Sequence, residues 1–104
     1  MRDEIIIAPE AVEDLQTFKS NVRAQILGAI ERHLRHEPTK TSKVSIQRLR
    51  GISRPQYRLR VGDDNRVFYD VSADTVAVLA IVSKAKANEW LERYGVSDEE
   101  SGII

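Results

Sequence analysis

The stretch 57–69 constrains the fold more than any other part of the chain. Apolar and cationic residues alternate over its first five positions, and alternation at period two predicts a strand with one buried face. The Gly-Asp-Asp-Asn run at 62–65 supplies the residues that a tight hairpin turn requires, and a second strand follows it directly. The sequence therefore predicts a β-hairpin that turns Tyr57, Leu59 and Val61 toward a core.

The opposite face of this hairpin gathers cations. Arg58 and Arg60 share that face, and Arg66 is expected to return beside them, exposed, on the second strand. Three arginines on one face repel one another, so folding alone gives no reason to gather them. Guanidinium groups bind phosphate through forked hydrogen bonds. We call these three residues the arginine face and interpret it as a candidate anion site; the alternative is a solvated cationic strand.

Charge is segregated along the chain, although the formal net charge is zero. Residues 39–66 hold eight basic and two acidic side chains, and the segments on either side are net acidic. Such a block can attract a polyanion locally, and the alternative is an ordinary charged surface. Beyond the arginine face, the residues that we expect to contact a nucleic acid are Lys43, Arg48, Arg50 and Arg54.

Several classes of site are disfavoured by composition. The chain has no cysteine, which excludes disulfides and thiolate chemistry and suits a reducing cytoplasm. No third ligand accompanies His33 and His36, so we expect no metal and no cofactor. The N-terminus is too acidic for a signal peptide, and no apolar run approaches the roughly 20 residues of a membrane span. We expect a cytoplasmic domain over residues 1–95 and an acidic, disordered tail at 96–104.

The hydrophobic patterns predict an α+β domain in the order β-α-α-β-β-β-α. A β-rich run at 4–8 precedes two amphipathic helices, which end before Pro38. The apolar run 75–82 reads as a central strand covered on both faces, and a last helix is expected over 85–94. Tight turns join the three later strands into an antiparallel meander, with the helical hairpin on one face and the other face partly open.

Three motifs stand out: Leu49-Arg50-Gly51, the YRLRVGD run at 57–63, and Arg66-Val67-Phe68-Tyr69. Together with the order of elements, they resemble the RelE/ParE superfamily of toxins from type II toxin–antitoxin systems, over residues 5–94. The resemblance implies the RelE-like fold: an N-terminal strand, a two-helix hairpin, a three-stranded antiparallel meander and a C-terminal helix. It also implies a cognate antitoxin as partner in a toxin–antitoxin hetero-oligomer.

The superfamily implies two different activities. RelE-like members enter the ribosomal A site and cut mRNA, whereas ParE-like members inhibit DNA gyrase and are not nucleases. Arg58, Arg60 and Arg66 match basic strand positions of RelE-like enzymes. The leading hypothesis is therefore a metal-independent, ribosome-dependent endoribonuclease (an mRNA interferase) that inhibits translation. The alternatives are a gyrase inhibitor and a weakened member that mainly binds its antitoxin.

Cleavage of this kind uses the 2′-hydroxyl of the RNA as nucleophile, so protons must be removed and supplied. Arginine cannot serve as the base, because its pKa lies above about 12. RelE-like enzymes place a basic residue after the last strand and a tyrosine on the following helix. Here Lys84 and Lys86 follow the strand, and Tyr94 is the nearest phenol. Trp90 is a candidate for stacking on an RNA base, and the alternative is a core anchor.

Overall fold

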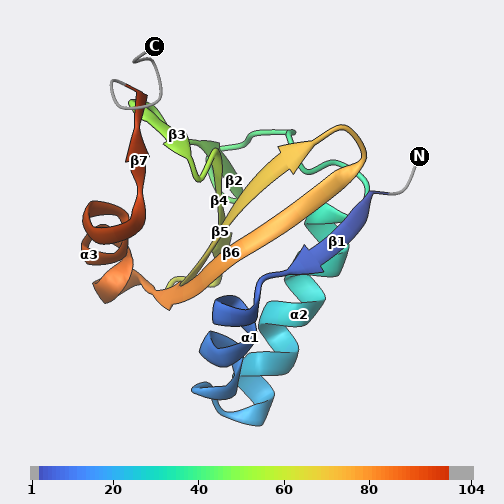
Figure 1. Ribbon diagram of the computed structural model, residues 1–104. Coiled ribbons are helices and arrows are strands. Elements are labelled where there is room, and N and C mark those ends of the chain that lie inside the picture. Colours follow the sequence, from blue (N-terminus) through green and yellow to red (C-terminus); the bar gives the residue numbers. More distant parts are fainter. Residues whose placement is uncertain (1–2, 99–104) are drawn as a thin grey trace.

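The computed structural model describes residues 3–98 and confirms an α+β fold (Figure 1). The elements are β1 (Glu4–Ile7), α1 (Pro9–Gln16), α2 (Ser20–Leu34), β2 (Ile46–Arg48), β3 (Ile52–Arg54), β4 (Tyr57–Val61), β5 (Asn65–Ser72), β6 (Thr75–Ser83), α3 (Lys84–Tyr94) and β7 (Val96–Ser97). The main sheet has the strand order β1-β6-β5-β4-β2. The α1–α2 hairpin covers one face of this sheet, and α3 covers part of the other.

Strands β4, β5 and β6 form the predicted antiparallel meander. Leu59 of β4 pairs with Val67 of β5, and the turn between these strands begins at Gly62. Gly62 has a φ of +59°, in the left-handed region that glycine adopts without a steric cost. β1 pairs in parallel with β6, where Ile7 lies opposite Val78. The meander therefore sits inside a mixed sheet, with β5 at its centre.

The main core lies between the helical hairpin and the sheet. Ile26, Ile30 and Leu34 recur every four residues and form the buried stripe of α2. Leu59 and Val67 pack in the same core from the sheet, and neither has any exposed surface. Burial of such side chains stabilises the fold by roughly 1.5–3 kcal/mol each, which fixes β4 and β5 against the helices.

The alternation predicted for β4 is confirmed. Leu59 and Val61 are buried in the main core, and the half-buried Tyr57 packs against it. Tyr57 stacks on Tyr69 of β5 with ring centroids 5.4 Å apart. The Tyr69 hydroxyl donates a hydrogen bond to the Pro38 carbonyl oxygen at 2.6 Å, and burial raises the pKa of Tyr69 well above its ordinary value. The phenol therefore stays protonated as the donor that ties the loop after α2 to the sheet.

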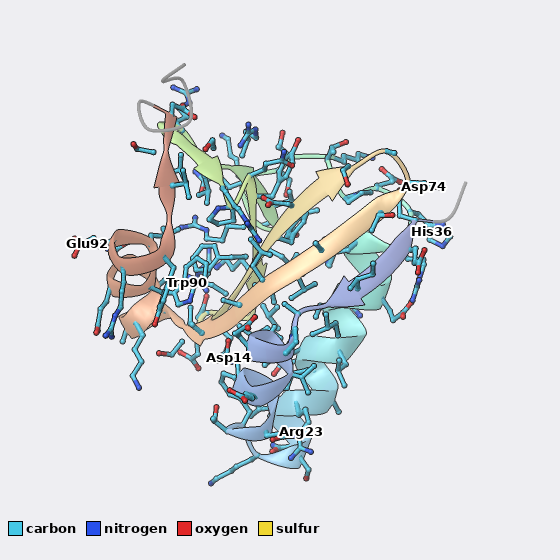
Figure 2. The ribbon with its side chains drawn as sticks, in the orientation of Figure 1. Asp14, Arg23, His36, Asp74, Trp90 and Glu92 are labelled. Atoms are coloured by element: carbon cyan, nitrogen blue, oxygen red, sulfur yellow. The ribbon has the colours of Figure 1, made fainter. Side chains whose placement is uncertain are left out.

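A second, smaller core lies under α3 on the other face of the sheet. Phe68 of β5 and Ala80 of β6 are buried there together with Ala87 of α3. Trp90 stacks on Phe68, with centroids 5.0 Å apart and ring planes 10° from parallel, and Figure 2 shows it between α3 and the sheet. β5 and β6 are thus covered on both faces, as the apolar run of β6 predicted.

Asp14 of α1 forms a hydrogen bond to the backbone of β6 where the strand lacks a described partner strand on one side. β1 ends at Ile7, opposite Val78, so among residues 3–98 no strand pairs with the following residues of β6 on that side. The Oδ2 atom of Asp14 accepts a hydrogen bond from the backbone N–H of Ile81 at 2.9 Å. A side chain of α1 thereby takes the place of a missing strand.

One small sheet was not predicted. Residues 52–54 form β3, which pairs with β7, where Ile52 lies opposite Ser97. The predicted disordered tail, 96–104, therefore differs from the structure at Val96 and Ser97, which form β7. Residues 99–104 of that tail lie outside the described residues.

Candidate anion-binding site

The register of β4 and β5 assembles the arginine face. Arg60 lies directly opposite Arg66, and Arg58 lies opposite Phe68 one pair further along. Leu59, Val61 and Val67 point into the main core, so the three arginines point to the other face of the sheet. The prediction that these residues come together on one face is confirmed.

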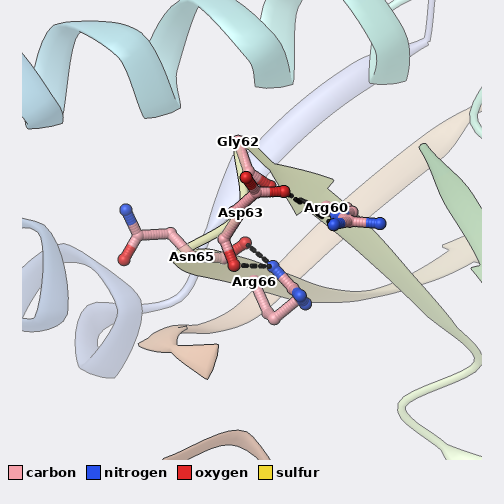
Figure 3. Close-up of polar contacts among 5 residues, drawn as sticks. All are labelled: Arg60, Gly62, Asp63, Asn65 and Arg66. Carbon is pink, nitrogen blue, oxygen red and sulfur yellow. Dashed lines mark hydrogen bonds and ion pairs between the residues drawn. The ribbon is translucent and has the colours of Figure 1, made fainter. Parts of the chain in front are cut away.

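Arg66 was expected to be exposed, and this expectation is wrong. Arg66 is only 5% exposed. Its Nη1 atom donates hydrogen bonds to the carbonyl oxygens of Asn65 at 2.8 Å and Asp63 at 3.2 Å (Figure 3). The physical reason is its place on the central strand, where the guanidinium folds back onto the carbonyls of the β4–β5 turn.

The other two arginines are also held by neighbours. Arg60 forms an ion pair with Asp63, with Nη2 and Oδ1 2.7 Å apart, at the exposed turn (Figure 3). Arg58 donates from Nη2 to the Oε1 atom of Gln47 on β2. The Nε atom of Arg58 is buried and has no hydrogen-bond partner among the described residues. The side chains of Arg58 and Arg60 are therefore oriented, but not neutralised by buried carboxylates.

The arrangement favours binding of an anion. Like charges directly opposite one another on paired strands destabilise a sheet, and Arg60 and Arg66 are such a pair. The pKa of Arg66 is lowered, first by burial and then by repulsion from Arg58 and Arg60. A phosphate beside these guanidinium groups would offset that repulsion and accept their charge-assisted hydrogen bonds. The same donors would stabilise negative charge that develops on a phosphate during a reaction.

The two predicted lysines lie at the start of α3. The backbone N–H of Lys84 donates to the Asp64 carbonyl oxygen at 2.6 Å, which fastens the beginning of α3 to the β4–β5 turn. Carbonyl oxygens of the same turn accept hydrogen bonds from Arg66, so the Cα atom of Lys84 lies close to the arginine face. Lys84 and Lys86 are both exposed. The structure therefore brings the start of α3 together with the arginines.

Tyr94 and Trp90 lie elsewhere. Tyr94 follows Lys84 by ten residues along α3, a distance of about 15 Å at 1.5 Å per residue. Both aromatic residues line a hollow of about 670 Å³ between α1 and α3, together with Arg54. Trp90 packs against Phe68 on one side and lies 5.5 Å from the Tyr94 ring. In the structure, Trp90 anchors α3 to the core.

Of the predicted RNA-binding cations, Arg48 lies off the arginine face and Arg54 has an acidic partner. Arg48 lies over the Tyr57 ring at 5.3 Å, on the face of β2 that bears the buried Ile46, and not on the arginine face. Arg54 pairs with Asp70, with Nε and Oδ2 3.4 Å apart. The remaining two, Lys43 and Arg50, are exposed.

Sequence reasoning missed His33, which it considered only as a metal ligand and set aside. His33 is half-buried and lines a hollow of about 410 Å³ together with Arg60 and Arg32. Burial lowers the pKa of His33, and the charge of Arg32 lowers it further. The available signal was its spacing, since His33 follows the buried Ala29 by four residues and so lies on the same side of α2.

Within residues 3–98, no three His, Asp or Glu side chains lie close enough together to hold a metal ion. No helix in the same range is long and apolar enough to cross a membrane.

The chain is similar to known toxins in sequence and in fold. A family model described as the ParE toxin of the type II toxin–antitoxin system, parDE, matches residues 5–88. A chain of the archaeal RelE–RelB complex from Pyrococcus horikoshii is 25% identical, with a TM-score of 0.66 over 83% of this chain and 99% of that one. A chain of the Mycobacterium tuberculosis RelBE2 complex is 20% identical, with a TM-score of 0.63 over 81% and 100%. A chain of the E. coli DinJ–YafQ complex is 13% identical, with a TM-score of 0.58 over 82% and 96%. The comparison with curated protein sequences gave no match.

Proposed function

The chain belongs to the ParE toxin family of type II toxin–antitoxin systems, within the RelE/ParE superfamily, and from this premise we propose that it cuts ribosome-bound mRNA in the cytoplasm. The observation that carries the proposal is the arginine face. It gathers three guanidinium groups, and one of them, Arg66, is desolvated beside the other two. Such a cluster suits a phosphodiester that gains negative charge as it is cleaved.

In the proposed reaction, the arginines orient the scissile phosphate and stabilise the charge on its oxygens. The neighbouring 2′-hydroxyl attacks the phosphorus, and the bond to the 5′-oxygen breaks, leaving a 2′,3′-cyclic phosphate. Lys84 and Lys86 are the proposed proton carriers closest to the arginine face, because α3 begins at the turn that holds Arg66. Tyr94 remains a proposed carrier only for a substrate that spans the length of α3.

A second function, inhibition of DNA gyrase, is favoured by the family model, which is that of the ParE toxin. The chemistry of the arginine face is also compatible with it. Arg58, Arg60 and Arg66 bind anions well but cannot act as bases near neutral pH. A toxin that only binds its target needs no proton carrier.

The proposed partner is an antitoxin that forms a hetero-oligomer with this chain and covers the arginine face. Two of the structural relatives named above are toxin–antitoxin complexes by their descriptions, RelBE2 and DinJ–YafQ. We expect expression of this chain alone to stop growth, and co-expression of the antitoxin to restore it.

The two functions are separated by one pair of assays on the purified chain. For a ribonuclease, we expect cleavage of mRNA on programmed ribosomes without added metal, with 2′,3′-cyclic ends, and normal supercoiling by gyrase. Cleavage should be lost in Arg66→Gln and kept in Arg93→Gln, a matched change at an exposed arginine of α3. Intact mRNA together with blocked supercoiling would reject the ribonuclease and support gyrase inhibition.

A further inference from the structure

Two adjoining hollows run along one side of α2. The first, of about 410 Å³, lies between α2 and the β4–β5 turn. The second, of about 520 Å³, lies between the end of α2 and the loop that leads to β2. Arg32, His33 and Ser45 line both hollows, so the two are continuous. We call the combined feature the α2 groove.

The α2 groove meets the arginine face at Arg60. The register places Arg60 opposite Arg66 on the arginine face, and Arg60 is also among the residues that line the first hollow. This is possible because β2 pairs with β4 only as far as Leu59, and beyond it the Arg60 N–H donates to the Ser45 carbonyl oxygen. At this corner of the sheet, the half-buried Arg60 borders both surfaces.

The lining of the α2 groove is cationic and rich in hydroxyl groups. Its cations are Arg32, Lys40 and Arg60, and Thr41, Ser42 and Ser45 supply the hydroxyls. The two carboxylates present already have partners: Asp63 pairs with Arg60 at 2.7 Å, and Glu37 pairs with Lys40 at 3.2 Å. Arg32 is exposed and has no ion pair within the described part of the chain.

His33 lines both hollows of the α2 groove, so its pKa is sensitive to an anion bound there. The imidazole is half-buried between the two hollows, and its pKa is lowered by burial and by Arg32. The other charged or titratable groups that line the two hollows around it are Arg60, Asp63, His36, Glu37 and Lys40. A bound anion would offset the repulsion from the cations and favour the protonated imidazole.

We propose that the α2 groove binds the phosphodiester backbone of the RNA strand whose scissile phosphate lies on the arginine face. This inference rests on the proposed ribonuclease function and extends its substrate site around the edge of the sheet. Cations interspersed with hydroxyl groups suit a run of phosphate and sugar oxygens. Apart from Ala29, the apolar side chains among the lining residues are Val44, Ile46 and Val61, and the last two are buried. A groove of this composition favours RNA over an apolar peptide helix.

The test is the salt dependence of binding to a labelled single-stranded RNA oligonucleotide, measured by fluorescence anisotropy with the full chain. Loss of one phosphate contact should lower the slope of log K against log salt by about 0.7. We expect that decrease, with weaker binding, in Arg32→Gln and in Lys40→Gln. The matched controls are Arg93→Gln and Lys19→Gln, two exposed cations away from the groove, and both should bind like the parent.

A second measurement uses only the parent chain, so it does not depend on the folding of a variant. It also distinguishes RNA from an acidic peptide as the ligand. In NMR titrations of the parent chain, RNA should raise the pKa of His33, and polyglutamate at matched charge should not. A response to polyglutamate alone would identify a site for an acidic peptide and overturn the proposal. Unchanged salt slopes in both groove variants, or no binding of RNA at low salt, would also overturn it.

RNA binding in the α2 groove and the proposed ribonuclease activity are tested by different results. A parent chain that binds RNA through Arg32 and Lys40 but never cleaves mRNA on ribosomes would keep the groove and reject the proposed activity. Cleavage with unaltered RNA binding in the groove variants would keep the activity and reject the groove.

Discussion

Arg66 and Phe68 lie two residues apart on β5 and point to the same face of the sheet, yet their surroundings are opposite. Arg66 is buried among turn carbonyls and two further arginines, whereas Phe68 is buried against Trp90 of α3. Neither is more than 5% exposed. The comparison shows that alternation along a strand decides the face, while the elements packed above it decide the role. Where α3 covers the sheet, the face is core; where α3 only begins, the face carries the arginines.

The largest expected effect is the loss of stability when Phe68, the residue under α3, is truncated. Phe68→Ala should lower the free energy of unfolding by about 3–5 kcal/mol, because it removes a fully buried ring and the stack under Trp90. Urea denaturation measures this loss. The control is Tyr94→Ala at an aromatic ring that is 58% exposed, which should cost far less. Equal losses for the two variants would mean that Phe68 is not a core residue.

The next effect distinguishes the role of Arg66 from that of Phe68. Arg66→Gln should lower the rate of mRNA cleavage by about a hundred- to a thousandfold, the equivalent of 2.7–4 kcal/mol for a donor lost from the transition state. Glutamine removes the buried charge and keeps an amide donor beside the turn, so we expect a loss of stability no greater than about 1.5 kcal/mol. Urea denaturation and single-turnover cleavage on programmed ribosomes measure the two quantities. A variant that unfolds as readily as Phe68→Ala would make Arg66 a structural residue.

A smaller effect tests whether α3 contributes to the reaction at its first turn. Lys84→Arg or Lys86→Arg should lower cleavage at least about tenfold, because general acid–base catalysis typically contributes a hundredfold or more and arginine keeps the charge without an accessible pKa. Tyr94→Phe, at the far end of α3, should have the smaller effect. Substrate binding should be unchanged in all three. A parent-like rate in both lysine variants would remove the start of α3 from the mechanism.

The smallest expected effect concerns His33, which lies beyond the edge of the arginine face, and is measured as the pH dependence of folding stability. The pKa of His33 is lower in the folded chain than its ordinary value of 6.5. Below that value the unfolded chain binds more protons, so folding stability contributed by neutral His33 is present above pH 6.5 and is lost as pH falls through the folded pKa. The free energy of unfolding of the parent should therefore decrease from pH 7 to pH 5 more steeply than that of His33→Gln. His36→Gln is the matched control, and identical pH profiles for parent and His33→Gln would contradict the prediction.

The sequence was informative where structure is determined locally. The hairpin at 57–69 was predictable because alternation and turn residues lie within one short segment, and the three arginines followed from its register. β3 was not predictable, because its partner, β7, lies more than forty residues away and neither strand has a pattern of its own. The burial of Arg66 and the position of His33 likewise depend on the β4–β5 turn and on the packing of α2 against the sheet.

The hydrogen bond from the Ile81 N–H to Asp14 has a consequence for self-association. An open strand edge is a template on which a second chain can add a strand, and such edges lead to aggregation. Asp14 occupies the backbone donor that an incoming strand would need, and it places a carboxylate where that strand would have to lie. Displacing it would leave a charge to be desolvated beside the new strand. The chain is thus protected at this edge from pairing with copies of itself.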